Sequence, residues 1–229
     1  AVLGFCDEEM LSASPGLFWV QVYWAGVENC IANPAMQTGN KLLTNGQRIA
    51  SPALAEHAIA LMMMLARGLD VYYANQLEGE WRPETGLARS EHMELEGRTL
   101  LVVGLGGIGT QVAKRAHGLG MRVLATRNSR REGPEYVEYV GLANELNVLA
   151  AQADVVINTA PLTDQTRGIF NAEFFNAMKP EAFFITVGRG GSTVTDDLVA
   201  ALNSGAIKGA GLDVTDPEPL PEGNPLWTM

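Results

Sequence analysis

Cysteine is scarce in this sequence of 229 residues, which contains only Cys6 and Cys30. These two residues form no C-x-x-C motif and have no metal-ligand spacing. We therefore expect isolated thiols, no metal site and a reducing, cytoplasmic environment. Long apolar runs are also absent: the longest, at positions 58–66, has nine residues, whereas a membrane-spanning helix needs about 20. Positive charge is in deficit too, and the net charge of −10 argues against nucleic-acid or anionic-membrane partners.

The start of the chain lacks the features of a secretory leader. Acidic residues at positions 7–9 stand where such a leader would carry basic ones. The chain begins at Ala1 directly in a strand-like run, and it stops at Met229 shortly after a turn-rich segment. We therefore expect it to be an internal segment of a longer protein.

The most informative motif is Gly104-Leu105-Gly106-Gly107-Ile108-Gly109, which matches G-x-G-x-x-G. Four apolar residues precede it, as in a buried parallel strand, and a helical pattern follows. Glycines at these positions allow a sharp turn, close approach of a pyrophosphate and tight packing of the helix on the sheet. A glycine-rich turn alone is weak evidence, but between a strand and a helix it predicts dinucleotide binding.

Further strand-like and helical segments alternate after this motif. The expected strands are 100–103, 122–126, 154–159, 182–187 and 209–214. The expected helices are 108–118, 143–151, 172–178 and 196–203. This alternation predicts an α/β fold with a doubly wound parallel sheet of the Rossmann type. A mostly apolar helix should begin at Ser51-Pro52 and be buried on most sides.

The sequence lacks the acidic residue whose carboxylate accepts a hydrogen bond from the ribose 2′-hydroxyl in NAD-binding units. Such units place it about 20 residues beyond the glycines. Here Arg127 stands eighteen positions after Gly109 (127 − 109). The next residues are Asn128, Ser129, Arg130 and Arg131. Guanidinium groups and a hydroxyl would hold a 2′-phosphate that a carboxylate would repel, so we expect NADP rather than NAD. The alternative is a solvated basic loop.

Other polar or backbone-exposing residues also follow strand-like runs, where a parallel sheet binds its ligands. They are Ala160-Pro161, Gly188-Arg189-Gly190 and Asp213. Near the start of the chain, Ala25-Gly26-Val27 follows the strand-like run 18–23. Its backbone N–H groups could meet an anion, although a plain turn explains it equally well.

Several motifs in order carry a family resemblance. They are GLGGIG, HGLGMRVLATR, ADVVINTAPLTDQTRGIFN, FFNAMKPEAFFITVGRGG and LVAALNSGAIKGAGLDVTDPEPLPEGNPLW. The whole sequence resembles the D-isomer-specific 2-hydroxyacid dehydrogenases, and its basic loop is most similar to the glyoxylate/hydroxypyruvate reductase branch. The resemblance implies that residues 1–48 are part of a flavodoxin-like substrate domain. It likewise implies that residues 49–229 form the dinucleotide-binding domain, with a helix at 54–69 that links the domains and supports a homodimer.

The resemblance also implies roles for individual residues. Arg189 and Glu218 would be catalytic, Glu218 lying five positions after Asp213 (218 − 213), and Asp213 would lie beside the nicotinamide. The substrate carboxylate would bind Arg189 and the loop Ala25-Gly26-Val27. Beyond the glycine motif and the basic loop, the implied cofactor contacts are Thr159, Ala160, Pro161, Thr166, Val187, Gly188 and Asp213. Gly107 departs from the pattern, because many members have a basic residue there.

The acid/base histidine of the family lies in a T-P-H motif that these residues do not contain. His57, His92 and His117 stand in other contexts, and we expect His57 to be structural. The sequence favours an NADPH-linked reductase that converts a small 2-oxo acid, such as glyoxylate or hydroxypyruvate, to the D-2-hydroxy acid. An NAD-linked dehydrogenase of the same fold, acting on phosphoglycerate or formate, is one alternative. A dinucleotide-sensing corepressor with protein partners is another.

Overall fold

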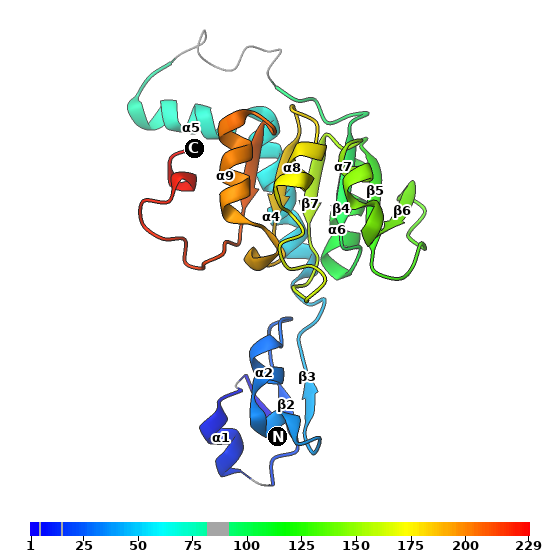
Figure 1. The fold of residues 1–229 in the computed structure, drawn as a ribbon, viewed down its shortest axis with the longest axis vertical. Coiled ribbons are helices and arrows are strands. Elements are labelled where there is room, and N and C mark those ends of the chain that lie inside the picture. The colour runs from blue at the N-terminus through cyan, green and yellow to red at the C-terminus, as the bar shows by residue number, and fades with distance from the viewer. Residues whose placement is uncertain (5, 15, 82–91) are drawn as a thin grey trace. The chain divides into compact units, whose positions relative to one another are not determined.

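The computed structural model describes residues 1–4, 6–14, 16–81 and 92–229 (Figure 1). The chain divides into two compact units, Ala1–Ala53 and Leu54–Met229. Among the described residues, no helix has the length and apolar character needed to cross a membrane.

The first unit is a small parallel sheet with three helices. Its strands pair in the order β1 (Val2–Leu3), β2 (Trp19–Gln21) and β3 (Leu42–Thr44). The helices are α1 (Glu8–Ala13), α2 (Glu28–Ala32) and α3 (Pro34–Gln37). Among the described residues of this unit, the buried core is small and consists of Leu11, Val20, Val22 and Cys30.

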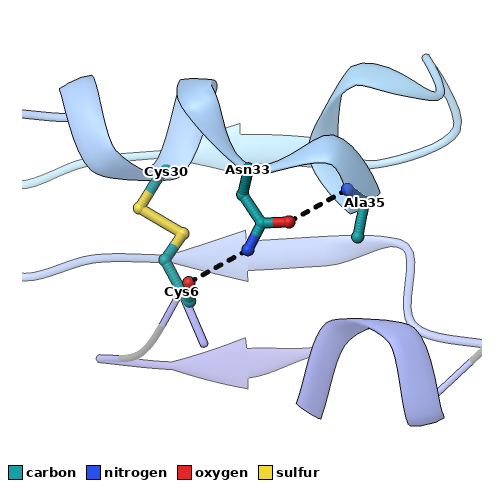
Figure 2. Close-up of a disulfide and its surroundings, with 4 residues drawn as sticks. All are labelled: Cys6, Cys30, Asn33 and Ala35. Carbon is teal, nitrogen blue, oxygen red and sulfur yellow. Dashed lines mark hydrogen bonds between the residues drawn. A yellow bond between two sulfur atoms is a disulfide. The ribbon is translucent and has the colours of Figure 1, made fainter. Parts of the chain in front are cut away.

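A disulfide joins Cys6 to Cys30, so the expectation of two isolated thiols is wrong (Figure 2). The two Cα atoms lie 5.3 Å apart, although the residues are separated by 24 positions in the sequence. Beside the disulfide, Asn33 Nδ2 donates to the Cys6 carbonyl at 3.3 Å, and Asn33 Oδ1 accepts from the Ala35 amide at 2.9 Å. Cys6 follows β1 and Cys30 lies in α2, which follows the parallel neighbouring strand β2. The fold therefore brings together two cysteines whose spacing in the sequence does not predict a pair.

The second unit is built on a six-stranded parallel sheet with the order β6-β5-β4-β7-β8-β9. The strands are β4 (Thr99–Val103), β5 (Arg122–Arg127), β6 (Tyr139–Leu142), β7 (Val155–Asn158), β8 (Phe183–Thr186) and β9 (Gly209–Leu212). This is the strand order of a doubly wound dinucleotide-binding sheet. The chain adds strands on one side of β4 first and then on the other, so the order of strands reverses between β4 and β7. The sequence pattern does not predict β6, because it is a four-residue edge strand interrupted by Gly141.

Helices cover both faces of this sheet. Alternate residues of β4 face opposite sides, so Leu100 and Val102 belong to one core cluster and Leu101 and Val103 to the other. The first cluster includes α4 (Ser51–Arg67) and α6 (Gly107–Gly118). The second includes α7 (Leu146–Ala150), α8 (Ala172–Ala177) and α9 (Thr195–Ser204) (Figure 1). The predicted helices therefore all form, with residues 143–145 as a 3-10 turn.

Helix α4 begins at Ser51 as expected. Its fully buried residues lie along one face, and residues beside them are half-buried against the same core, namely Ile59, Leu61, Met63 and Leu65. The buried residues are Ser51, Ala55, Ala58, Met62 and Ala66, at helical spacing. Met64 is 39% exposed on another face. Gly68 has a φ of 60°, which ends α4, and a separate helix α5 (Leu69–Glu78) follows.

A buried carboxylate holds the amino ends of the central strands together. Asp154, just before β7, accepts a hydrogen bond from the Thr99 amide at 2.8 Å. Lys179 Nζ lies 3.0 Å from the same carboxylate, and Arg98 Nη1 lies 3.7 Å from it. These contacts lie at the end of the sheet opposite the strand ends discussed next.

Candidate active site

The glycine turn follows β4 directly and leads into α6, as the sequence predicts. Gly104 has a φ of 92°, which favours glycine, and a Cβ on it would lie 2.8 Å from the Ala160 Cα. A Cβ on Gly109 would collide with the Gly104 carbonyl and would lie 2.8 Å from Thr159 Oγ1. By contrast, a Cβ on Gly106 would meet open space. The turn is therefore packed against the residues after β7 but open at Gly106, where a pyrophosphate could reach the first amides of α6.

The residues after β7 support this turn. Thr159 Oγ1 donates to the Gly104 carbonyl at 2.6 Å, so the two neighbouring strand ends are tied together. Further along, Thr166 Oγ1 donates to the Pro161 carbonyl at 2.7 Å and accepts from the Thr163 amide at 2.7 Å. Thr166 thus shapes the 161–166 turn through its hydroxyl.

Arg127 is the last residue of β5 and pairs with Leu142 of β6. Its Nε is buried and has no hydrogen-bond partner in the described part of the chain. A buried donor without an acceptor costs free energy, and an anion bound at this strand end would supply the acceptor. The following residues Asn128, Ser129 and Arg130 are exposed. The open glycine turn fits a dinucleotide, and the Arg127 Nε leaves an acceptor position unfilled at the end of β5.

Arg131 differs from the other basic residues of the loop because it is already engaged. Its Nη2 lies 2.7 Å from Glu145 Oε2, and its Nη1 donates to the Tyr139 hydroxyl at 2.8 Å. The Tyr139 hydroxyl and the Leu142 amide also donate to the Glu145 carboxylate, at 2.6 and 2.8 Å. The Tyr139 hydroxyl, the Leu142 amide and the Arg131 guanidinium together lower the pKa of Glu145 to about 2. The basic loop therefore contains one arginine in a closed network, while Arg130 is exposed and Arg127 is half-buried.

Arg189 follows β8 in an extended conformation, with φ −140° and ψ 137°. Its neighbours are pressed between two other loops. A Cβ on Gly188 would lie 2.8 Å from the Ala160 carbonyl oxygen, and a Cβ on Gly190 would overlap the Thr215 carbonyl. The Arg189 side chain is exposed, and its Nη1 donates to the Gly188 carbonyl at 2.9 Å. The backbone of the loop is thus held firmly by close packing on both sides of Arg189.

Asp213 and Glu218 follow β9 and line one cavity of about 900 Å³. The Asp213 amide donates to the Thr186 carbonyl at 3.0 Å, which fixes its backbone beside β8. Arg189 lies outside the lining of this cavity. The structure thus places Asp213 and Glu218 together, with Arg189 on the adjacent loop.

His57 contacts a candidate site residue that sequence reasoning did not link to it. Its Nε2 lies 3.2 Å from Asp213 Oδ1, with the two side chains 48% and 36% exposed. His92 lies elsewhere: its Nε2 is 3.1 Å from the Tyr72 hydroxyl on α5. His57 lies near the start of α4, and Asp213 follows the carboxyl end of β9. The sequence contains no local signal for this contact.

The loop Ala25-Gly26-Val27 lies in the first unit, between β2 and α2. Asn45 Nδ2 donates to the Ala25 carbonyl at 2.7 Å, and the Gly46 amide donates to the Trp24 carbonyl at 3.1 Å. The residues after β3 therefore hold this loop from the side. Gly26 and Val27 are half-buried and Ala25 is exposed.

Comparison with known proteins identifies the family. Residues 59–229 match the family model described as D-isomer specific 2-hydroxyacid dehydrogenase, NAD binding domain. The chain is 36% identical over 218 residues to a glyoxylate reductase of Thermococcus onnurineus, covering 93% of the chain and 64% of that protein. The chain thus spans slightly less than two thirds of this relative.

Solved structures give the same result. A structure from Thermus thermophilus has a TM-score of 0.83 at 37% identity, over 96% of this chain and 68% of that one. An NADPH-dependent glyoxylate/hydroxypyruvate reductase from Sinorhizobium meliloti, in complex with NADP and sulfate, has a TM-score of 0.82 at 28% identity. That match covers 99% of this chain and 71% of the other. The chain belongs to the D-isomer specific 2-hydroxyacid dehydrogenase family.

Proposed function

We propose that the chain forms the cofactor-binding part, and a portion of the substrate-binding part, of an NADPH-linked reductase of small 2-oxo acids. Glyoxylate and hydroxypyruvate are the proposed substrates, and the D-2-hydroxy acid is the product. The observation that carries the cofactor choice is Arg127, whose buried Nε lacks a partner within the described residues, at the strand end where an NAD-binding unit has an acid. The NADPH-dependent reductase of Sinorhizobium meliloti supports the same choice.

The chain's own residues would divide the work of binding between them. The glycine turn and the start of α6 would hold the pyrophosphate, and Arg127, with Asn128, Ser129 and Arg130, would hold the 2′-phosphate. The residues proposed to line the rest of the cofactor are Thr159, Ala160, Pro161, Thr166, Val187, Gly188 and Asp213. NADPH, when bound, supplies the hydride.

Arg189 would bind the substrate by its planar guanidinium, which can donate to the carboxylate and the carbonyl oxygen at once. These hydrogen bonds would stabilise the negative charge that develops on the carbonyl oxygen. Glu218 would orient the acid/base group that delivers the proton, and Ala25-Gly26-Val27 would offer backbone amides to the substrate carboxylate. Residues 1–48 are accordingly proposed to belong to the substrate domain and residues 49–229 to the dinucleotide-binding domain.

We also propose a homodimer formed through α4 and α5. Met64, Leu69, Tyr73 and Leu77 are 39%, 51%, 60% and 71% exposed, which leaves an apolar surface along these two helices. A second copy of the chain would cover it. Light scattering of the purified protein tests this assignment, because Leu77→Glu should then lower the measured mass to that of a monomer.

The cytoplasm is the proposed compartment, since it supplies NADPH. Cytoplasmic thiols keep most protein disulfides reduced, so Cys6 and Cys30 would there be a dithiol. Alkylation of protein in freshly lysed cells, followed by mass spectrometry, reports which form is present.

Cofactor titration tests the proposed function. Arg127→Asp should weaken NADPH binding by about tenfold to a hundredfold, because a charge-assisted contact to the 2′-phosphate is lost, and it should change NADH binding by less than about threefold. Lys114→Asp, an equal change of charge at an exposed position of α6, serves as the control and should leave both affinities unchanged. Equal losses for NADPH and NADH in Arg127→Asp would contradict the assignment. Turnover with glyoxylate and hydroxypyruvate, followed by NADPH absorbance, tests the substrate class.

A further inference from the structure

Asn158 is a fully buried polar residue at the end of β7, and every polar atom of its side chain is used. Its Nδ2 donates to Thr186 Oγ1 and to Ser192 Oγ, both at 3.0 Å. Its Oδ1 accepts from the Ala160 amide at 3.0 Å. One side chain therefore joins the end of β8, the loop after β8 and the turn after β7.

Ser192 extends this network to Arg189. The Ser192 side chain is fully buried, and its Oγ donates to the Arg189 carbonyl at 2.7 Å while accepting from Asn158. The donor and acceptor roles are consistent along the whole path. A continuous path of hydrogen bonds thus runs from the Ala160 amide through Asn158 and Ser192 to the backbone of Arg189.

Close backbone packing restricts movement of the residues along this path. A Cβ on Gly188 would lie 2.8 Å from the Ala160 carbonyl oxygen and 3.0 Å from Asn158 Nδ2. The Val187 amide also donates to the Asn158 carbonyl at 3.1 Å. A displacement of the Ala160 turn must therefore displace the Arg189 loop as well.

We propose that Asn158 is a positioning residue that couples the Ala160 turn to the Arg189 loop, so that a dinucleotide bound at the turn orders the arginine that receives the substrate. The roles of the two loops rest on the proposed function. Asparagine suits this position because one amide offers two donors and an acceptor. A leucine of similar size would leave the Ala160 amide buried without an acceptor and would remove the donor to the Thr186 and Ser192 hydroxyls, which is costly.

The neighbouring hydroxyl provides a matched control. Thr193 is 9% exposed and its Oγ1 is buried without a hydrogen-bond partner in the described part of the chain. Ser192→Ala and Thr193→Val each remove one buried hydroxyl from adjacent positions of one loop. Only the first of these hydroxyls belongs to the path.

Amide hydrogen exchange of the purified protein, with and without NADPH, measures the coupling directly. In the wild type and in Thr193→Val, NADPH should slow exchange at residues 188–193 by about tenfold, the scale of one or two buried hydrogen bonds. In Ser192→Ala this response at 188–193 should largely disappear, while NADPH still protects the glycine turn at 104–109. Asn158→Ala should lose it too, and its urea midpoint shows whether that variant is folded.

Steady-state kinetics give a second readout. Ser192→Ala should raise KM for glyoxylate by about tenfold while the Kd for NADPH stays within about twofold of wild type. A response at 188–193 in Ser192→Ala equal to that of wild type would overturn the inference, and so would the absence of any response in the wild type. If the response behaves as expected but the wild type reduces no 2-oxo acid, the proposed function fails while the coupling stands.

Discussion

Reduction of the disulfide Cys6–Cys30 should unfold the first unit at much lower denaturant concentrations. The disulfide closes a loop with a sequence separation of 24 residues. The chain-entropy relation gives about 3.5 kcal/mol for a loop of this length. A unit of 53 residues is expected to have a stability of only about 3–8 kcal/mol. The cross-link therefore supplies a large share of the stability of a unit whose described residues include a buried core of only four side chains.

The expected shift can be measured by urea unfolding. With an m-value near 1 kcal/mol/M, typical of a small unit, reduction should lower the midpoint of the first unit by about 3.5 M. Trp19 and Trp24 report on this unit once Trp81 and Trp227 are replaced by phenylalanine. Each transition is recorded with and without dithiothreitol, and the second unit is followed by circular dichroism.

A Cys6→Ser/Cys30→Ser double variant serves as the control. It should unfold like the reduced protein and be insensitive to dithiothreitol. If the oxidised and reduced proteins share one midpoint, the cross-link does not stabilise the unit and the reasoning from loop length is refuted. Alkylation with mass accounting confirms that the oxidised sample carries the disulfide.

Three further predictions concern the second unit. Arg189→Ala should cut kcat/KM for glyoxylate by orders of magnitude with NADPH affinity nearly unchanged, and Arg189→Lys should restore only part because an ammonium lacks the planar fork; near-normal turnover of the alanine variant would remove Arg189 from the site. Gly109→Ala should abolish cofactor binding measured by fluorescence titration, because its Cβ would collide with the Gly104 carbonyl and Thr159 Oγ1; retained affinity would disprove this packing. Glu145, whose folded pKa of about 2 lies below its ordinary value of 4.5, should contribute stability that is complete above pH 4.5 and is lost as the pH falls towards 2. Glu145→Gln should therefore lose less stability than wild type between pH 4.5 and 2, and parallel melting curves would contradict that sign.

Much of the second unit follows from the sequence because its signals are local. The strand at 100–103 and the glycines after it predict β4, the turn and α6 without any long-range information. Periodicity likewise predicts the other strands except β6. The glycine in this short edge strand breaks the apolar run on which the prediction depends.

What the sequence does not predict are contacts between distant segments. The disulfide joins a loop after β1 to α2, and His57 meets Asp213 from a helix far away in the chain. The sequence of the basic loop likewise does not predict that Arg127 Nε is buried or that Arg131 pairs with Glu145. Composition identifies these side chains as charged or reactive, but only the fold decides what each one faces.

The contacts of Asp154 have a consequence for how the sequence of this unit can change in evolution. The bonds of Asp154 to the Thr99 amide and to Lys179 hold the sheet at the amino ends of the strands. The loops at the opposite ends, which carry Arg189 and Asp213, therefore do not have to carry that part of the stability. Substitutions at exposed positions of those loops, such as Arg189, should therefore cost less folding stability than substitutions of Asp154. A homologue that keeps the Asp154 contacts can therefore change the exposed residues of these loops, and with them its ligand, while it keeps the same fold.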